Sequence, residues 1–121
     1  MRVTQHPNLA KVNKKRGKYN AMKCIIDGHK FDSKIEGDYY ILYRDKQQKG
    51  LISNLELHPV YPIIINSKKI CKVILDFRFF DEDSGETKVV DIKGLDTAIS
   101  KLKRKMVEAQ HGIIVEVIKT R

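Results

Sequence analysis

The 121-residue chain is 41% hydrophobic and 32% charged, a balance that suits one compact domain with a single core. No apolar run is long enough to cross a membrane, and the first residues lack the hydrophobic segment of a signal peptide, so we expect a cytoplasmic protein. Cys24 and Cys71 have neither a CxxC pattern nor a histidine at ligand spacing, which favours reduced thiols over a structural zinc site.

The net charge of +9 is unevenly distributed along the chain. Seven basic residues precede Asp27, the first acidic residue, and a second basic cluster lies at 101–105. Clustered cations are typical of proteins that bind nucleic acid, although a solvated surface that only aids solubility has the same composition. The cations that we expect to contact a phosphate backbone are Lys14, Lys15, Arg16, Lys18, Lys101 and Lys105.

The N-terminal residues 1–17 are polar, basic and without periodicity, so we expect a flexible arm ahead of a single domain over residues 18–121. Met22–Ile26 then indicates a short strand. Asp27-Gly28 is a hairpin turn signal, and it leads into a second short strand at 29–31.

The first helix is predicted over residues 33–49. Ser33 and Glu36 have the spacing of a capping box, and Gly50 is a suitable stop. Apolar side chains recur at helical spacing within this range, at Ile35, Tyr39, Leu42 and Tyr43.

Three extended runs follow, over residues 53–65, 69–80 and 87–93. Pro59 and Pro62 interrupt the first run, which indicates an edge strand or a bent strand.

A second helix is predicted over residues 97–110, followed by a final strand over 113–118. We expect the buried stripe of that helix to consist of Ile99, Leu102, Met106 and Ala109.

Charged residues interrupt the last two of the three extended runs. Asp76 and Asp91 lie 15 positions apart with a turn-rich stretch between them, so a hairpin would bring them together, and strand alternation places Lys93 on the face of Asp91. Carboxylates and the Ile92 carbonyl can hold Mg²⁺ (or Mn²⁺), and a lysine can orient water, which suits hydrolysis of a phosphodiester. The alternative is that both aspartates only pair with Arg78 and Lys93 on a solvent-facing sheet.

Two further residues can join this group. Glu36 is a third carboxylate, but on periodicity alone its position in the capping box favours a role as a helix cap. His58 can approach from the neighbouring strand and touch phosphate or a ligand water, whereas a lone histidine in a strand is more often structural.

The ordered set of an early-helix Glu36, Asp76 on one strand and Asp91-Ile92-Lys93 on the next resembles the PD-(D/E)xK nuclease superfamily. The resemblance extends over about residues 18–118. Four short segments of the sequence look most like a small phage-encoded branch of this superfamily, related to Holliday-junction resolvases and restriction endonucleases. These segments are Phe31-Asp32-Ser33-Lys34-x-Glu36, Leu55-Glu56-Leu57-His58-Pro59, Asp76-Phe77-Arg78 and Val90-Asp91-Ile92-Lys93-Gly94.

The resemblance implies an α/β fold with a restriction-endonuclease-like core, in which a mixed β-sheet is flanked by two helices in the order β-hairpin-α-β-β-β-α-β. It also implies that Glu36, Asp76 and Asp91 bind Mg²⁺ or Mn²⁺ and that Lys93 is the catalytic lysine. Two features depart from the pattern of the superfamily. Leu75 stands where a proline usually precedes the first aspartate, and Asp91 stands where glutamate is commoner.

These expectations together predict a metal-dependent DNA endonuclease. Because no helix-turn-helix or zinc-finger pattern is present, we expect selection of branched DNA by its shape, as in a Holliday-junction resolvase. Paired cuts across a two-fold junction predict a symmetric homodimer, acting in the host cytoplasm if a phage encodes it. The alternatives are a non-catalytic DNA-binding protein on the nuclease fold and a packaging or recombination accessory protein.

Overall fold

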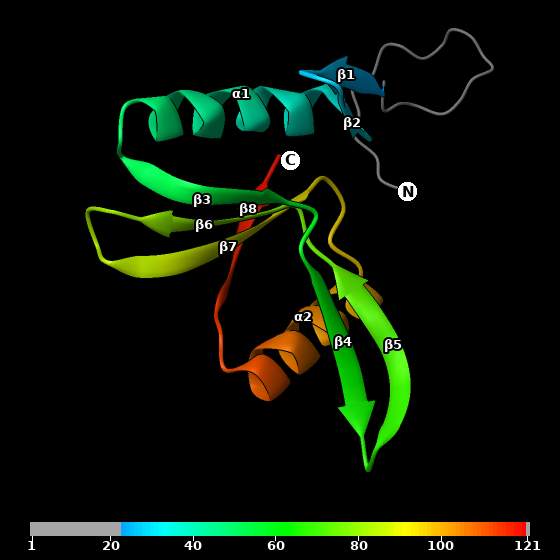
Figure 1. The fold of residues 1–121 in the computed structure, drawn as a ribbon. Coiled ribbons are helices and arrows are strands. Elements are labelled where there is room, and N and C mark those ends of the chain that lie inside the picture. Colours follow the sequence, from blue (N-terminus) through cyan, green and yellow to red (C-terminus); the bar gives the residue numbers. More distant parts are fainter. Residues whose placement is uncertain (1–22, 121) are drawn as a thin grey trace, which may run out of the picture.

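The computed structural model describes residues 23–120 (Figure 1). The predicted arm over residues 1–17 therefore lies outside the described residues, as do the predicted DNA contacts Lys14, Lys15, Arg16 and Lys18. The elements in chain order are β1 Cys24–Ile26, β2 His29–Phe31, α1 Lys34–Gln48, β3 Ile52–Leu57, β4 Val60–Ile65, β5 Lys68–Ile74, β6 Phe77–Asp81, β7 Glu86–Lys93, α2 Ala98–His111 and β8 Val115–Lys119.

A four-stranded mixed sheet with the order β3-β6-β7-β8 forms the centre of the molecule. Strand β8 is parallel to β7, whereas the other neighbouring pairs are antiparallel. The structure thus confirms an α/β fold with two helices and a mixed sheet. Helix α1 lies over one face of the sheet, and α2 lies on the other side together with β4 and β5 (Figure 1).

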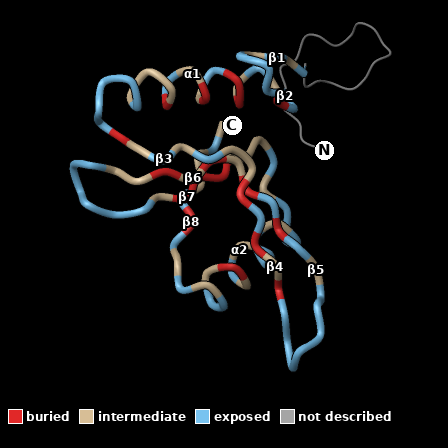
Figure 2. Tube along the Cα trace, viewed as in Figure 1, coloured by how far each residue is buried: buried red, intermediate tan, exposed pale blue. Residues whose placement is uncertain are grey.

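Each face of the sheet has its own hydrophobic core, and adjacent residues of β7 supply one side chain to each. Val90 packs with Phe31, Tyr43 and Phe77 beneath α1. Val89 packs with a second cluster that joins the sheet to α2 and β4–β5, formed by Tyr61, Ile63, Val73, Leu75, Val107 and Val115. The buried segments of Figure 2 follow these two layers. Both clusters follow from strand alternation, which sends successive side chains to opposite faces.

The predicted runs over 53–65 and 69–80 are each broken into two strands, so five strands stand where three were predicted between the helices. The chain bends at His58–Pro59 and again at Leu75–Asp76, which lie opposite one another. Backbone hydrogen bonds cross this bend from His58 N to Asp76 O (2.9 Å) and from Leu75 N to Pro59 O (3.0 Å). The result is one long ribbon whose far half, β4–β5, leaves the main sheet as a separate two-stranded sheet.

The first hairpin and the first helix form where the sequence predicts them. Asp27 and Gly28 have φ values of 54° and 81°, the left-handed conformation that a tight hairpin turn requires. Ser33 caps α1 by accepting a hydrogen bond from Glu36 N at 3.1 Å. A Cβ on Gly37 would lie 2.7 Å from Cys24 Sγ, so only glycine allows the hairpin to pack this closely on α1.

The predicted buried stripe of the second helix is confirmed only at Met106, which packs against the core cluster on the α2 side of the sheet. Ile99 and Leu102 are 65% and 55% exposed, and Ala109 is exposed as well. The fully buried residue of α2 is Val107, with Arg104 next to the same layer. Apolar periodicity did not identify the buried face of this helix, because that face carries the charged side chain of Arg104, which forms ion pairs in the interior.

Candidate metal centre

The β6–β7 hairpin brings the two predicted aspartates together. Phe77 pairs with Val90 in the antiparallel register, so Asp76 and Asp91 are the next residues beyond the last pair. The backbone N–H of Asp76 donates to Val90 O at 3.1 Å, which fixes the start of β6 against β7. The structure thus confirms the prediction that this hairpin brings Asp76 and Asp91 close together.

Glu36 divides its two carboxylate oxygens between the helix end and the site. Oε1 accepts a hydrogen bond from Asp32 N at 3.2 Å, one residue before the capping Ser33. Oε2 lies 3.1 Å from His58 Nε2, and the whole residue is only 6% exposed. A helix-capping role and a role in the site are therefore compatible, because each uses a different oxygen.

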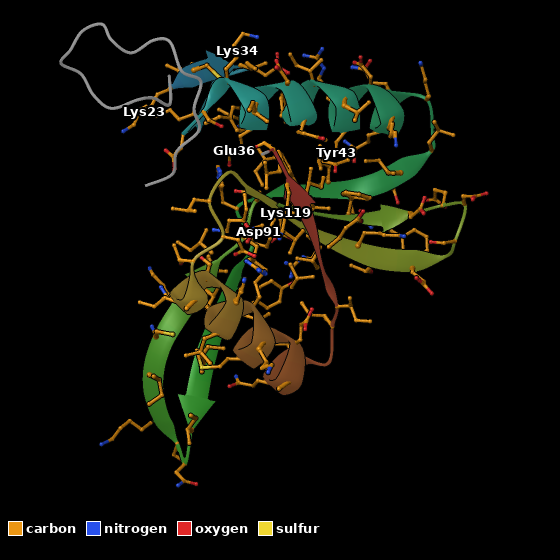
Figure 3. All side chains as sticks on the ribbon, turned by 180° about the vertical axis from the view of Figure 1, so that it is seen from behind. Lys23, Lys34, Glu36, Tyr43, Asp91 and Lys119 are labelled. Carbon is orange, nitrogen blue, oxygen red and sulfur yellow. The ribbon has the colours of Figure 1, made fainter. Side chains whose placement is uncertain are left out.

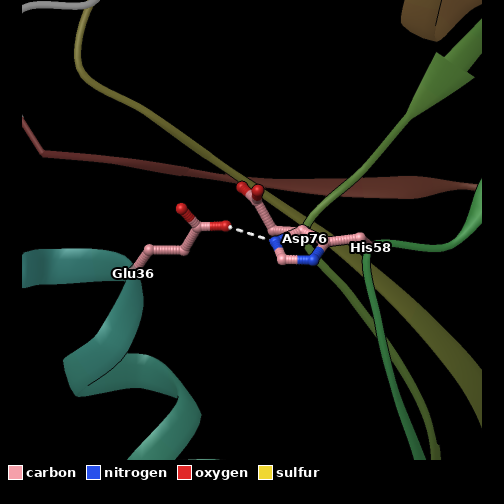
Figure 4. Close-up of side chains that lie close together, drawn as sticks. All are labelled: Glu36, His58 and Asp76. Atoms are coloured by element: carbon pink, nitrogen blue, oxygen red, sulfur yellow. Dashed lines mark hydrogen bonds and ion pairs between the residues drawn. The ribbon is translucent and has the colours of Figure 1, made fainter. Parts of the chain in front are cut away.

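His58 reaches the site from the bend between β3 and β4. Its φ of 53° lies in the left-handed region, which is disfavoured for a residue that precedes proline. Strain of this kind costs of order 1–3 kcal/mol and occurs most often at functional sites. Figure 4 shows the carboxylates of Glu36 and Asp76 and the His58 ring gathered close together, three side chains from three different parts of the chain.

Burial and mutual repulsion act strongly on the aspartates. Burial, followed by the negative charge of Glu36, raises the pKa of Asp76 to about 7. Burial, followed by the charge of Asp76, raises the pKa of Asp91 to about 6, although Lys93 and Arg104 act in the opposite direction. Glu36, Asp76 and Asp91 therefore form a cluster of buried negative charge that a cation would stabilise.

Two cations lie beside Asp91. Lys93 Nζ is 3.7 Å from Asp91 Oδ2, which agrees with the predicted placement of both side chains on one face of the strand. Arg104 lies 3.5 Å from the same oxygen and also forms two short bonds to Asp96, of 2.9 and 2.6 Å. Sequence reasoning missed the site position of Arg104 and counted it only among the surface cations. Figure 3 shows Asp91 between the layers of α1 and α2.

The Ile92 backbone contributes an N–H group to the site. This N–H donates to Asp76 Oδ2 at 2.7 Å and holds the carboxylate in place. Because the N–H and C=O of a strand residue point to the same side, the Ile92 carbonyl is directed to the side of β7 on which Asp76 lies. Its predicted role as a metal ligand stays a prediction.

The alternative explanation for Asp76 does not hold, since Arg78 pairs with Glu56 at 2.6 Å and with the Tyr61 hydroxyl. The alternative for Asp91 is partly realised in its ion pair with Lys93.

The remaining predicted DNA contacts lie on α2. Lys101 and Lys105 are exposed one turn apart on that helix, in positions that fit the prediction without testing it. A hollow next to His58 is lined by groups suited to a polar substrate, among them His29, Lys30 and Tyr40.

The donor set fits a divalent cation. Ligand atoms of Glu36, His58 and Asp76 lie within 4.8 Å of one another, and Asp91 borders Asp76. Carboxylate oxygens suit Mg²⁺ and Mn²⁺, whereas an imidazole nitrogen is accepted by Mn²⁺ more readily than by Mg²⁺. The residues present therefore match the predicted metals, with a preference for the softer ion.

Comparison with protein families places residues 16–120 in a family described as protein of unknown function (DUF1064), and the chain belongs to that family. Neither the curated proteins nor the solved structures contain a match to the chain. Within residues 23–120, no helix has the length and apolar character needed to cross a membrane.

Proposed function

We propose that this DUF1064 chain is a divalent-metal-dependent DNA endonuclease with a restriction-endonuclease-like core. The observation that carries the proposal is the convergence of two buried carboxylates, Glu36 and Asp91, with the partly buried Asp76, beside Lys93. Buried carboxylates that repel one another cost stability, and such clusters are retained where a bound cation or a reaction uses them.

The roles of the side chains follow from their positions. Glu36, Asp76 and Asp91 would hold Mg²⁺ or Mn²⁺, which when bound supplies charge neutralisation and a more acidic water. Lys93, half-buried next to Asp91, orients that water or stabilises the phosphoryl oxygens. Arg104 keeps Asp91 in place from the α2 side. His58 either completes the metal shell or contacts the phosphate.

The substrate that we propose is branched DNA, cut by a symmetric homodimer in the manner of a Holliday-junction resolvase. The support is the excess of positive charge and the absence of a base-reading module in the sequence. Sedimentation with junction DNA tests the dimer, and a protein that stays monomeric at micromolar concentration excludes it.

A cleavage panel tests the activity. Plasmid, linear, flap and four-way-junction DNA are incubated with the protein and Mg²⁺ or Mn²⁺, with Asp91→Ala as the control. We expect cleavage of branched DNA that this substitution abolishes. Cleavage that survives Asp91→Ala refutes the site.

The competing function is a DNA-binding or accessory protein without catalysis. The ion pairs of Asp91 with Lys93 and Arg104 favour it, because they neutralise this carboxylate without a metal. Calorimetric titration with Mn²⁺ separates the two functions. Saturable binding that is lost in Glu36→Gln and Asp76→Asn supports the nuclease, and no binding supports the accessory protein.

A further inference from the structure

The ribbon half that leaves the main sheet, β4–β5 with its turn (residues 60–74, here called the wing), is not used by the proposed site. It projects from the body of the molecule in Figure 1, with α2 behind its root. Its inner face packs through Tyr61, Ile63 and Val73 into the core shared with α2. The outer face and the tip remain exposed.

The charge of the wing is of one sign. No acidic residue occurs between Glu56 and Asp76, whereas Lys68, Lys69 and Lys72 are all exposed. Within residues 23–120, none of these three lysines takes part in an ion pair. Helix α2, which packs against the inner face of the wing, carries further exposed lysines at positions 101, 103 and 105.

Aliphatic side chains accompany these lysines. Val60 and Ile74 form a cross-strand pair on the outer face and are 50% and 54% exposed, while Ile65 beside the turn is 55% exposed. Lysines interspersed with exposed aliphatic groups on a two-stranded ribbon fit a nucleic-acid groove, where cations meet phosphates and apolar groups meet sugars and base edges.

The wing begins and ends at the candidate metal centre. His58 lies two residues before β4, and Asp76 lies two residues after β5. Six residues of β-strand span about 20 Å, and base pairs rise about 3.4 Å each, so the tip reaches about six base pairs from its root. A phosphodiester held at the centre thus has its flanking duplex within reach of the tip lysines.

We propose that the wing binds the duplex arm of DNA that flanks the scissile phosphodiester, through Lys68, Lys69 and Lys72. The inference rests on the proposed function, which supplies DNA as the ligand and the metal centre as the position of the scissile phosphodiester. The competing explanation is that the lysines protect exposed sheet edges from aggregation. Charge reversal separates these roles, because glutamate protects an edge as well as lysine does but repels phosphate.

The test measures DNA affinity without cleavage, by fluorescence anisotropy of the full chain in EDTA. The probes are two four-way junctions, one with arms of about 12 base pairs and one with arms of about four base pairs closed by loops. The variants are Lys68→Glu/Lys69→Glu and, as a matched charge control at the far end of α1, Lys46→Glu/Lys49→Glu. A third variant, Lys72→Glu, reverses one charge in the middle of β5, and circular dichroism verifies the fold of each.

We expect the wing variant to lose at least about tenfold in affinity for the long arms and to reduce the salt slope by about two. On the short arms it should bind like the wild type, while Lys72→Glu should show a smaller loss on the long arms. Equal losses in the wing variant and the α1 control, or equal losses on both probes, overturn the inference. A wing effect without any metal-dependent cleavage retains the wing as a duplex-binding surface and rejects the nuclease, so the two failures are distinguishable.

Discussion

Replacement of Asp76 by asparagine should stabilise the metal-free protein. The pKa of Asp76 is raised from its ordinary value of 3.8 to about 7, mainly by burial. Since one pKa unit corresponds to about 1.4 kcal/mol, ionisation of this carboxyl in the folded state costs about 4 kcal/mol. Asparagine is nearly isosteric and can still accept the hydrogen bond from Ile92 N.

The sign of the pH dependence follows from linkage. A carboxyl whose pKa is raised in the folded state contributes stability that is fully present below pH 3.8 and lost as the pH rises through about 7. The metal-free wild type should therefore lose stability between these values, whereas Asp76→Asn should keep only the smaller loss that comes from Asp91, whose pKa is raised to about 6. We expect the variant to be more stable by about 2–4 kcal/mol near pH 8 and to differ from the wild type by less than about 1 kcal/mol near pH 4.

Urea denaturation in EDTA at both pH values measures this difference, with Asp38→Asn, an exposed carboxylate on the same helix as Glu36, as the control. Addition of Mn²⁺ should then raise the stability of the wild type and leave Asp76→Asn unchanged. An equal stability gap at the two pH values, or a variant no more stable than the wild type near pH 8, would refute the raised pKa of Asp76 and the cost of ionising this carboxyl in the folded state.

Three further substitutions test other parts of the site. His58→Ala should weaken Mn²⁺ binding more than Mg²⁺ binding in calorimetry, because only an imidazole discriminates between these ions; equal losses would exclude His58 as a ligand. Arg104→Gln should destabilise by about 3 kcal/mol in urea, since two carboxylates lose their buried partner. Gly37→Ala should lower stability by about 1–3 kcal/mol, and Cys24→Ala in the same chain should restore part of it if the 2.7 Å contact is the cause.

The elements with local chemical signals could be predicted from the sequence. Ser33 as a helix cap and Asp27-Gly28 as a turn depend on short-range backbone chemistry, and both occur as expected. The approach of Asp76 to Asp91 followed from a hairpin between adjacent runs. Such features need no knowledge of the tertiary packing.

Features set by packing could not be predicted. The inward face of α2 carries Arg104, whose burial depends on Asp96 and Asp91 from another element, so apolar periodicity selected the exposed Ile99 and Leu102 instead. The strand breaks at His58 and Asp76 could not be predicted either, because a proline indicates a bend without giving its direction.

The bend at His58–Pro59 and Leu75–Asp76 connects the two proposals. It removes His58 and Asp76 from the regular strands, which frees both side chains to face Glu36. The same change of direction sends β4–β5 away from the main sheet and against α2. Because the backbone bonds from His58 to Asp76 and from Leu75 to Pro59 hold both strands at this point, the distance from the candidate metal centre to the wing is fixed by a paired ribbon rather than by a flexible linker. A duplex seated on the wing would therefore present its phosphates to the centre at a defined offset, and a change in that offset would move the cleavage position instead of abolishing cleavage.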